Sequence, residues 1–117
     1  MMQTTIPSLT QALRDFAVAR DWAPFHSPKN LAAALSVEAA ELLEHFQWLT
    51  EAQSHNLAEP KKAEVAAEAA DVLLYLLQLC DKLDIDLLEY ARQKMLVNAE
   101  KYPVASARGS SQKHTAD

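Results

Sequence analysis

Residues 37–43 read Val-Glu-Ala-Ala-Glu-Leu-Leu, and thirty residues later 67–73 read Ala-Glu-Ala-Ala-Asp-Val-Leu. Each stretch places two acids three residues apart inside an apolar helical pattern. At about 100° per residue, the first acid of each stretch lies only about 40° around a helix from the apolar residue four positions later. The repeat therefore predicts two helices that carry carboxylates along the edge of their core-facing sides.

If these two helices pack through those sides, Glu38, Glu41, Glu68 and Asp71 converge at a partly dry site. Carboxylates crowded in a low dielectric repel one another and lose hydration, so a cation must neutralise them. Mg²⁺ suits such a site because it prefers carboxylate oxygens together with water and phosphate. The pattern predicts a Mg²⁺-dependent enzyme that acts on a phosphorylated substrate.

Composition narrows the fold and the partners. The chain has 117 residues, which suits one domain, and half of them are apolar. Gly109 is the only glycine, a composition that favours helices and rules out a Gly-rich phosphate loop. Phosphate must therefore be held by metal, by side chains or by helix ends. The net charge of −5 without a long basic stretch argues against binding to nucleic-acid polymers.

Several features predict a cytoplasmic protein with no membrane contact. The single Cys80 has no internal disulfide partner and sits in an apolar helical pattern, as a buried thiol in a reducing compartment would. Residues 1–10 lack the charged and apolar regions of a signal peptide. The apolar run over 72–77 is far too short to span a bilayer.

Capping residues and prolines predict four helices. The first is capped by Ser8 and Gln11, the second by Ser27, and the fourth by Asp84 or Asp86. The expected spans are about 8–20, 28–49, a third helix from Pro60 or Lys61 to about residue 83, and a fourth that Pro103 stops. Short connections between four helices are typical of an all-α four-helix bundle, here a helical domain over 1–103 followed by a polar tail over 104–117.

Acidic pairs at this spacing are common, and most are solvated. Glu44 lies about 60° further from the apolar side than Glu41, so we assign Glu44 to solvent. His45 and Tyr75 occupy matching positions, each four residues after the second acid of its stretch. Either could touch a ligand lying over the acids, although a supporting or surface role fits His45 better.

Aromatic and polar residues elsewhere have both a structural and a functional interpretation. Trp22 and Trp48 flank the second helix, where they either pack or give a nucleobase a flat surface to stack on. A polar stripe at helical spacing on the last helix is, by itself, an ordinary solvated face. It consists of Lys94, Asn98, Lys101 and Tyr102.

Seven short motifs, spread over about residues 9–115, carry a family resemblance. They are Arg20-Asp21-Trp22, Phe25-His26-x-Pro28-x-Asn30-Leu31, Glu38-x-x-Glu41-Leu42, Phe46-Gln47-Trp48, Glu68-x-x-Asp71-Val72-Leu73-x-Tyr75-Leu76, Lys94-Met95-x-x-Asn98-x-x-Lys101-Tyr102-Pro103, and Ser110-Ser111-x-Lys113-x-Thr115. With these motifs the chain resembles the MazG-like all-α nucleotide pyrophosphohydrolases, and within them the dCTP pyrophosphatases and their bacterial relatives.

The resemblance implies hydrolysis of a nucleoside triphosphate, dCTP or a modified dCTP above all, to the monophosphate and pyrophosphate, which cleanses the nucleotide pool. It implies that the four acids bind Mg²⁺, with Glu38 or Glu41 helping to take the proton of the attacking water. It also implies a homo-oligomer, with a tetramer favoured over a dimer. The substrate-binding residues that it implies are Trp22, His26, Lys29, Asn30, Trp48, Tyr75, Lys94, Asn98, Lys101, Tyr102, Ser111 and Lys113.

The chain departs from the family pattern at two positions. Leu13 stands where the vertebrate enzymes have a His near the base, and His114 stands where a Tyr is common. Two alternatives remain open: a broad or dUTP-directed nucleoside triphosphate diphosphatase, and a non-catalytic all-α interaction module. Metal titration separates the module from the enzymes, and product analysis separates the enzymes from one another.

Overall fold

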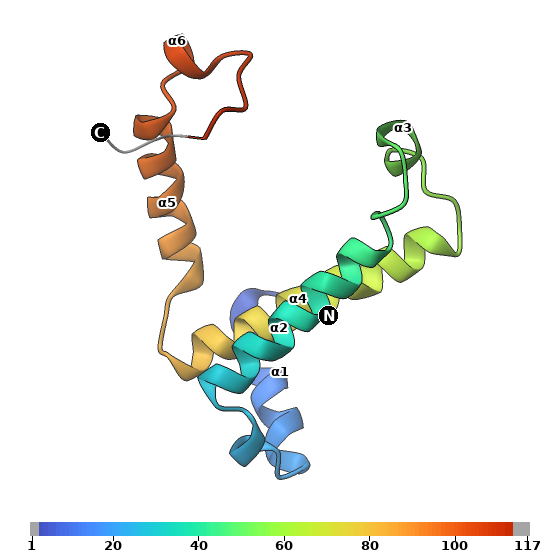
Figure 1. Cartoon of the computed structure of the whole chain (residues 1–117). Coiled ribbons are helices and arrows are strands. Elements are labelled where there is room, and N and C mark those ends of the chain that lie inside the picture. Colours follow the sequence, from blue (N-terminus) through green and yellow to red (C-terminus); the bar gives the residue numbers. More distant parts are fainter. Residues whose placement is uncertain (1–2, 114–117) are drawn as a thin grey trace. The chain divides into compact units, whose positions relative to one another are not determined.

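The computed structural model describes residues 3–113, and every regular element in that range is helical (Figure 1). The elements are α1 (Ile6–Ala19), the 3-10 turn η1 (Ala23–Phe25), α2 (Pro28–Glu44), α3 (Glu51–Ser54), α4 (Lys61–Lys82), α5 (Leu87–Lys101) and α6 (Val104–Ala107). The all-α prediction is confirmed. The chain divides into two compact units, one ending at Asp84 and the other beginning at Ile85.

The core of the first unit lies where α2 and α4 pack along each other, with α1 packed against α4. Leu31 of α2 and Leu77 of α4 are the most deeply buried side chains, at 1% and 2% exposure. Cys80 is buried and free, as predicted, and burial raises the pKa of its thiol. Because His45 at the end of α2 lies beside Lys61 at the start of α4, the two helices run antiparallel.

The start of α1 differs from the prediction. Thr5, not Ser8, is the cap: the Thr5 hydroxyl accepts from the Ser8 amide at 3.1 Å, and the Ser8 hydroxyl accepts from the Thr5 amide at 2.8 Å. Pro7 lies in the first helical turn, where its missing N–H leaves no helical bond unmade. Gln11 donates to Asp15 instead of closing a capping box.

The end of α2 and the following connection also differ. Ser27 caps α2 as predicted, by accepting from the Asn30 amide at 3.1 Å, but the helix ends at Glu44 and not near residue 49. Thr50 and Gln53 form a reciprocal capping box, which opens the short helix α3 inside the predicted loop. The local cap at Thr50 thus forms a short helix in a polar segment that was expected to be a loop.

The second unit contains α5 and α6. Asp86 caps α5 by accepting from the Glu89 amide at 3.2 Å, while Asp84 has a positive φ of 54° and ends the first unit. The predicted tail over 104–117 begins with a turn of helix, α6, placed after Pro103. Among residues 3–113, no helix is both long and apolar enough to cross a bilayer.

Candidate functional site

Three half-buried carboxylates gather where α2 faces α4. Glu38 and Glu41 come from α2, where their i,i+3 spacing places them on one side of the helix, and Glu68 comes from α4. One oxygen of each carboxylate lies within 4.8 Å of the other two. The acids of the two repeated stretches therefore meet, as the sequence predicts for these three, and could hold a metal ion.

Two of the carboxylate oxygens are left without a partner. The Oε2 atoms of Glu38 and Glu68 are buried, and neither has a hydrogen-bond partner among residues 3–113. No Lys, Arg or His forms an ion pair with these acids within the same range. A buried anionic oxygen without a donor or a cation is strongly unfavourable, and three oxygen ligands in one place suit a hard divalent cation. The residues present therefore fit a divalent metal ion.

The raised pKa of Glu38 agrees with the absence of a neighbouring basic side chain among residues 3–113. Burial raises the pKa of Glu38 to about 7, and the carboxyl groups of Glu68 and Glu41 and the charges of Glu41 and Asp71 add to the effect. A pKa near 7 favours the protonated form of Glu38 below neutral pH, and this proton reduces the repulsion among the carboxylates. A divalent ion would displace that proton, because it supplies the positive charge directly.

Asp71 occupies a different place from the other three acids. Its side chain is exposed and lies outside the three-carboxylate group, although its charge acts on Glu38. Asp71 lines a cavity of about 470 Å³ between α1 and α4, which we call the main cavity. Its lining residues are Leu9, Ala12, Leu13, Phe16, Trp22, His26, Asp71, Leu74, Tyr75 and Gln78.

The main cavity joins an aromatic wall to an acidic edge. Trp22 meets Phe16 edge to face at 5.6 Å between ring centroids and meets His26 at 6.0 Å. Asp71 and Tyr75 come from one face of α4, the face to which Leu74 and Gln78 also belong. Flat apolar rings next to carboxylates that can bind metal are what a nucleotide requires at its two ends.

The structure brings some predicted site residues into the main cavity and leaves others outside it. Trp22, His26 and Tyr75 line it, whereas Trp48 does not and is 86% exposed on the turn after α2. Lys29 is exposed in the first turn of α2. Asn30, in the same turn, donates its amide to the Phe25 carbonyl at 3.1 Å, so its polar group is engaged in shaping the η1–α2 connection.

The remaining predicted residues belong to the second unit. Lys94, Asn98 and Lys101 are exposed along α5, and Tyr102 follows at its end. Ser111 and Lys113 are exposed beyond α6. Thr115, which belongs to the last family motif, lies outside the described residues, as does His114, which departs from the family pattern.

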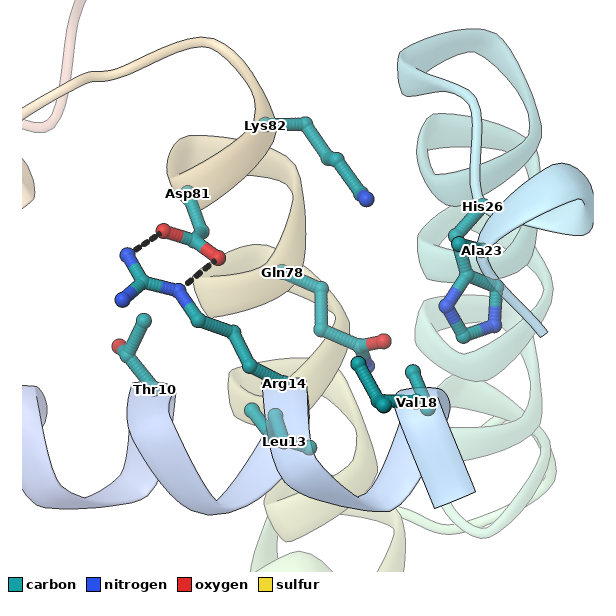
Figure 2. Close-up of a pocket in the computed structure, with 10 residues that line it drawn as sticks. Thr10, Leu13, Arg14, Val18, Ala23, His26, Gln78, Asp81 and Lys82 are labelled. Carbon is teal, nitrogen blue, oxygen red and sulfur yellow. Dashed lines mark hydrogen bonds and ion pairs between the residues drawn. The ribbon is translucent and has the colours of Figure 1, made fainter. Parts of the chain in front are cut away.

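The sequence did not predict the ion pair between α1 and α4. Arg14 of α1 donates to both carboxylate oxygens of Asp81 in the last turns of α4, with 2.8 Å from Nε to Oδ2 (Figure 2). This contact lowers the pKa of Asp81. No local pattern predicts a pair of residues so far apart in sequence.

The sequence could have indicated Gln78 as a residue that lines the main cavity, because it lies seven positions after Asp71 on the same face of a helix.

His45 also takes part in a charged group that the sequence left undefined. Its Nδ1 lies 3.2 Å from Lys61 Nζ and 4.0 Å from Glu64 Oε2. His45 follows Glu41 by one helical turn, and Glu64 precedes Glu68 by one, so this group adjoins the carboxylate cluster along both helices. The supporting position expected for His45 agrees with that contact.

Comparisons with known proteins agree with this fold. The MazG-like family matches residues 33–116. The chain is 38% identical to mouse dCTP pyrophosphatase 1 and 36% identical to the human protein of that name, each over 97% of this chain and 68% of the relative. A crystal structure of a pyrophosphatase from Archaeoglobus fulgidus superimposes with a TM-score of 0.80 at 43% identity, covering 88% of this chain and 96% of that one.

The fold and the site thus define an all-α protein with a carboxylate centre able to bind metal, placed beside an aromatic cavity. The chain belongs to the MazG-like family.

Proposed function

We propose that this protein is a Mg²⁺-dependent nucleoside triphosphate pyrophosphohydrolase that converts dCTP, or a modified dCTP, to the monophosphate and pyrophosphate. The observation that carries the proposal is the cluster of Glu38, Glu41 and Glu68, with two buried oxygens that have no hydrogen-bond partner among residues 3–113. The relationship to dCTP pyrophosphatases supplies the class of substrate. Such an enzyme would act in the cytoplasm to cleanse the nucleotide pool.

The carboxylates would have two roles, metal binding and proton transfer. Glu38, Glu41 and Glu68, with Asp71 beside them, would hold Mg²⁺, which when bound supplies positive charge to the phosphates and acidifies a water molecule. The water oxygen forms a bond to the α-phosphorus, and the bond from that phosphorus to the oxygen bridging toward the β-phosphorus breaks. Glu38 or Glu41 accepts the proton of the water and returns it to solvent. The products are the nucleoside monophosphate and pyrophosphate.

The main cavity would hold the nucleoside. Asp71 lies at the edge of the carboxylate cluster and also lines the cavity, so a nucleotide bound at the acids can extend into it. Trp22, His26 and Tyr75 offer rings to the base and sugar. The family resemblance assigns substrate contacts also to Lys29, Asn30, Trp48, Lys94, Asn98, Lys101, Tyr102, Ser111 and Lys113, the polar ones of α5 and beyond serving the phosphates and sugar.

A Trp22→Ala substitution tests this placement. Loss of a stacking ring weakens binding by about 1–3 kcal/mol, so KM should rise about five- to hundredfold with a smaller effect on kcat. Trp48→Ala, at an 86% exposed position, should leave the melting temperature unchanged and raise KM only if that ring completes a base site. An unchanged KM in both variants would leave the base without its proposed platform.

We also propose a homo-oligomer, a tetramer in preference to a dimer. Large apolar side chains are exposed on both units, including Val37 and Leu43 of α2 and Leu88 and Met95 of α5. Exposed apolar surface of this extent supports contact with further copies of the chain. Light scattering of the purified protein would give the mass, and a monomer at micromolar concentration would contradict the proposal.

Product analysis in ¹⁸O-labelled water tests the reaction itself. With Mg²⁺ and a panel of dCTP, dUTP, dTTP, dATP and dGTP, we expect pyrophosphate as the first product, the label in the monophosphate, and dCTP as the best unmodified substrate. Orthophosphate as the first product, or full activity in EDTA, would contradict the mechanism. Preferred turnover of dUTP or of all five would favour the alternative diphosphatases. No turnover together with no stabilisation by Mg²⁺ would favour the interaction module.

A further inference from the structure

A second, smaller cavity of about 200 Å³ continues the main cavity beyond the proposed base site. The two cavities share Leu13, His26 and Gln78 as lining residues. The smaller one lies among α1, η1 and the last turns of α4, and the Arg14–Asp81 pair forms part of its wall (Figure 2). We call it the substituent cavity.

The substituent cavity presents hydrogen-bond donors that nothing else uses. Lys82 has no hydrogen bond among residues 3–113, and its ammonium group is directed, with the Gln78 amide, toward the side where His26 lies (Figure 2). Gln78 Nε2 donates one hydrogen to the Leu74 carbonyl at 3.2 Å, which leaves its second hydrogen for another acceptor. Both ring nitrogens of His26 are also without a hydrogen bond in the described part of the chain.

The charge of the substituent cavity is positive in a chain whose net charge is −5. Among residues 3–113, Asp81 is the only acid that lines it, and Asp81 is already paired with Arg14. The ammonium of Lys82 is therefore left as an excess positive charge. Together with the free donors, this charge favours an anionic group that accepts hydrogen bonds.

The order of residues along α4 relates this charge to the nucleotide. Asp71 lines the main cavity outside the three-carboxylate group, Gln78 lines both cavities, and Lys82 lines the substituent cavity. The seven residues from Asp71 to Gln78 span about 10 Å of helix, and the next four add about 6 Å. If a nucleotide binds with its phosphates at the acids and its base in the main cavity, the edge of the base farthest from the sugar would lie toward Gln78 and Lys82.

We propose that the substituent cavity receives an acidic substituent on that far edge of the base, with a carboxylate as the best match to Lys82 and Gln78. This inference rests on the proposed function and deepens it, because it names the chemistry of the modified substrates. On a pyrimidine, C5 is the position on the far edge from which such a group can project. The enzyme then selects nucleotides whose bases carry an acid over those that carry a neutral group of similar shape.

The test compares kcat/KM of the full chain with Mg²⁺ for dCTP, 5-methyl-dCTP and 5-carboxy-dCTP. Lys82→Met keeps the length of the side chain and removes its charge. It should lower kcat/KM for the carboxylated substrate about tenfold relative to the methylated one, the size expected for one exposed charge-assisted hydrogen bond. Lys62→Met is the matched control, since Lys62 is exposed on the same helix and lines neither cavity.

A second variant tests whether a base substituent passes from the main cavity into the substituent cavity, by narrowing the region where the two cavities meet. Leu13→Phe enlarges a residue that both cavities share, so it should lower kcat/KM for both substituted substrates relative to dCTP, whatever their charge. Equal effects of Lys82→Met on all three substrates, or none on any, would overturn the proposal. So would an unchanged ratio of substituted to plain substrate in Leu13→Phe. Absence of pyrophosphate release from dCTP would instead refute the proposed function.

Discussion

Helix α4 carries carboxylates in two opposite environments. Glu68 meets Glu38 and Glu41, none of which pairs with a basic side chain among residues 3–113, and burial raises the pKa of Glu38 to about 7. Further along the same helix, the Arg14 guanidinium lowers the pKa of Asp81. The second group is complete within the chain and stabilises the packing of α1 on α4. The first has no such partner among residues 3–113, and crowded carboxylates of this kind are a candidate site for a ligand.

The largest difference between the two groups should be in catalysis. Glu41→Gln keeps the shape of the side chain but removes one charge from the cluster, and it should lower kcat/KM for pyrophosphate release at least about 100-fold. Glu44→Gln is the matched control, because Glu44 is exposed on the same helix. Activity of Glu41→Gln near that of the control at saturating Mg²⁺ would show that the cluster is not the catalytic centre.

Mg²⁺ should stabilise the folded protein through the cluster of Glu38, Glu41 and Glu68. Addition of Mg²⁺ should raise the melting temperature of the wild-type protein, because the ion binds the folded cluster and not the unfolded chain. The increase should be lost in Glu68→Gln and retained in Asp81→Asn, whose ion pair involves other residues. Differential scanning fluorimetry with and without Mg²⁺ measures this. An equal increase in all three proteins would place the metal elsewhere.

The two groups should also respond to pH with opposite signs. In the metal-free protein the pKa of Glu38 is raised from 4.5 to about 7, so the folded state binds this proton more tightly than the unfolded state does. Its contribution to stability is full below pH 4.5 and is lost as the pH rises through about 7. Urea unfolding in EDTA across this window should show a falling midpoint for the wild type and a flatter profile for Glu38→Gln. Matching profiles would argue against the raised pKa.

The smallest effect should come from removing the ion pair between Asp81 and Arg14. Asp81→Asn removes a partly exposed ion pair and should lower the melting temperature by a few degrees at neutral pH. Because the pKa of Asp81 is lowered from 3.8, this stabilisation is present above that pH and disappears as the pH falls through the lower folded value. Melting curves at neutral and acidic pH measure the difference, with Glu100→Gln, exposed on α5, as the control. If the melting temperatures of the wild type and Asp81→Asn differ equally at acidic pH, the loss of stability comes from packing and not from the ion pair.

Local patterns predicted the helices better than their ends. The repeat of 37–43 in 67–73 identified two amphipathic helices because helical periodicity depends only on neighbouring residues. The ends were less certain because neighbouring polar residues compete to cap them. Thr5 and Ser8 both offer a hydroxyl, and the helix begins after Thr5. Likewise Thr50 caps the short helix α3 within a polar segment that was expected to be a loop.

The sequence by itself determined the helical class, the absence of a Gly-rich phosphate loop and the carboxylate pairs, since composition and spacing along one helix suffice for these. Only the tertiary structure decided that Glu68 joins the acids of α2 while Asp71 faces the main cavity, and that Trp22 lines this cavity while Trp48 does not. These choices depend on the rotation and register of one helix against another. Contacts between distant residues around Leu31 and Leu77 set both, and no local pattern encodes them.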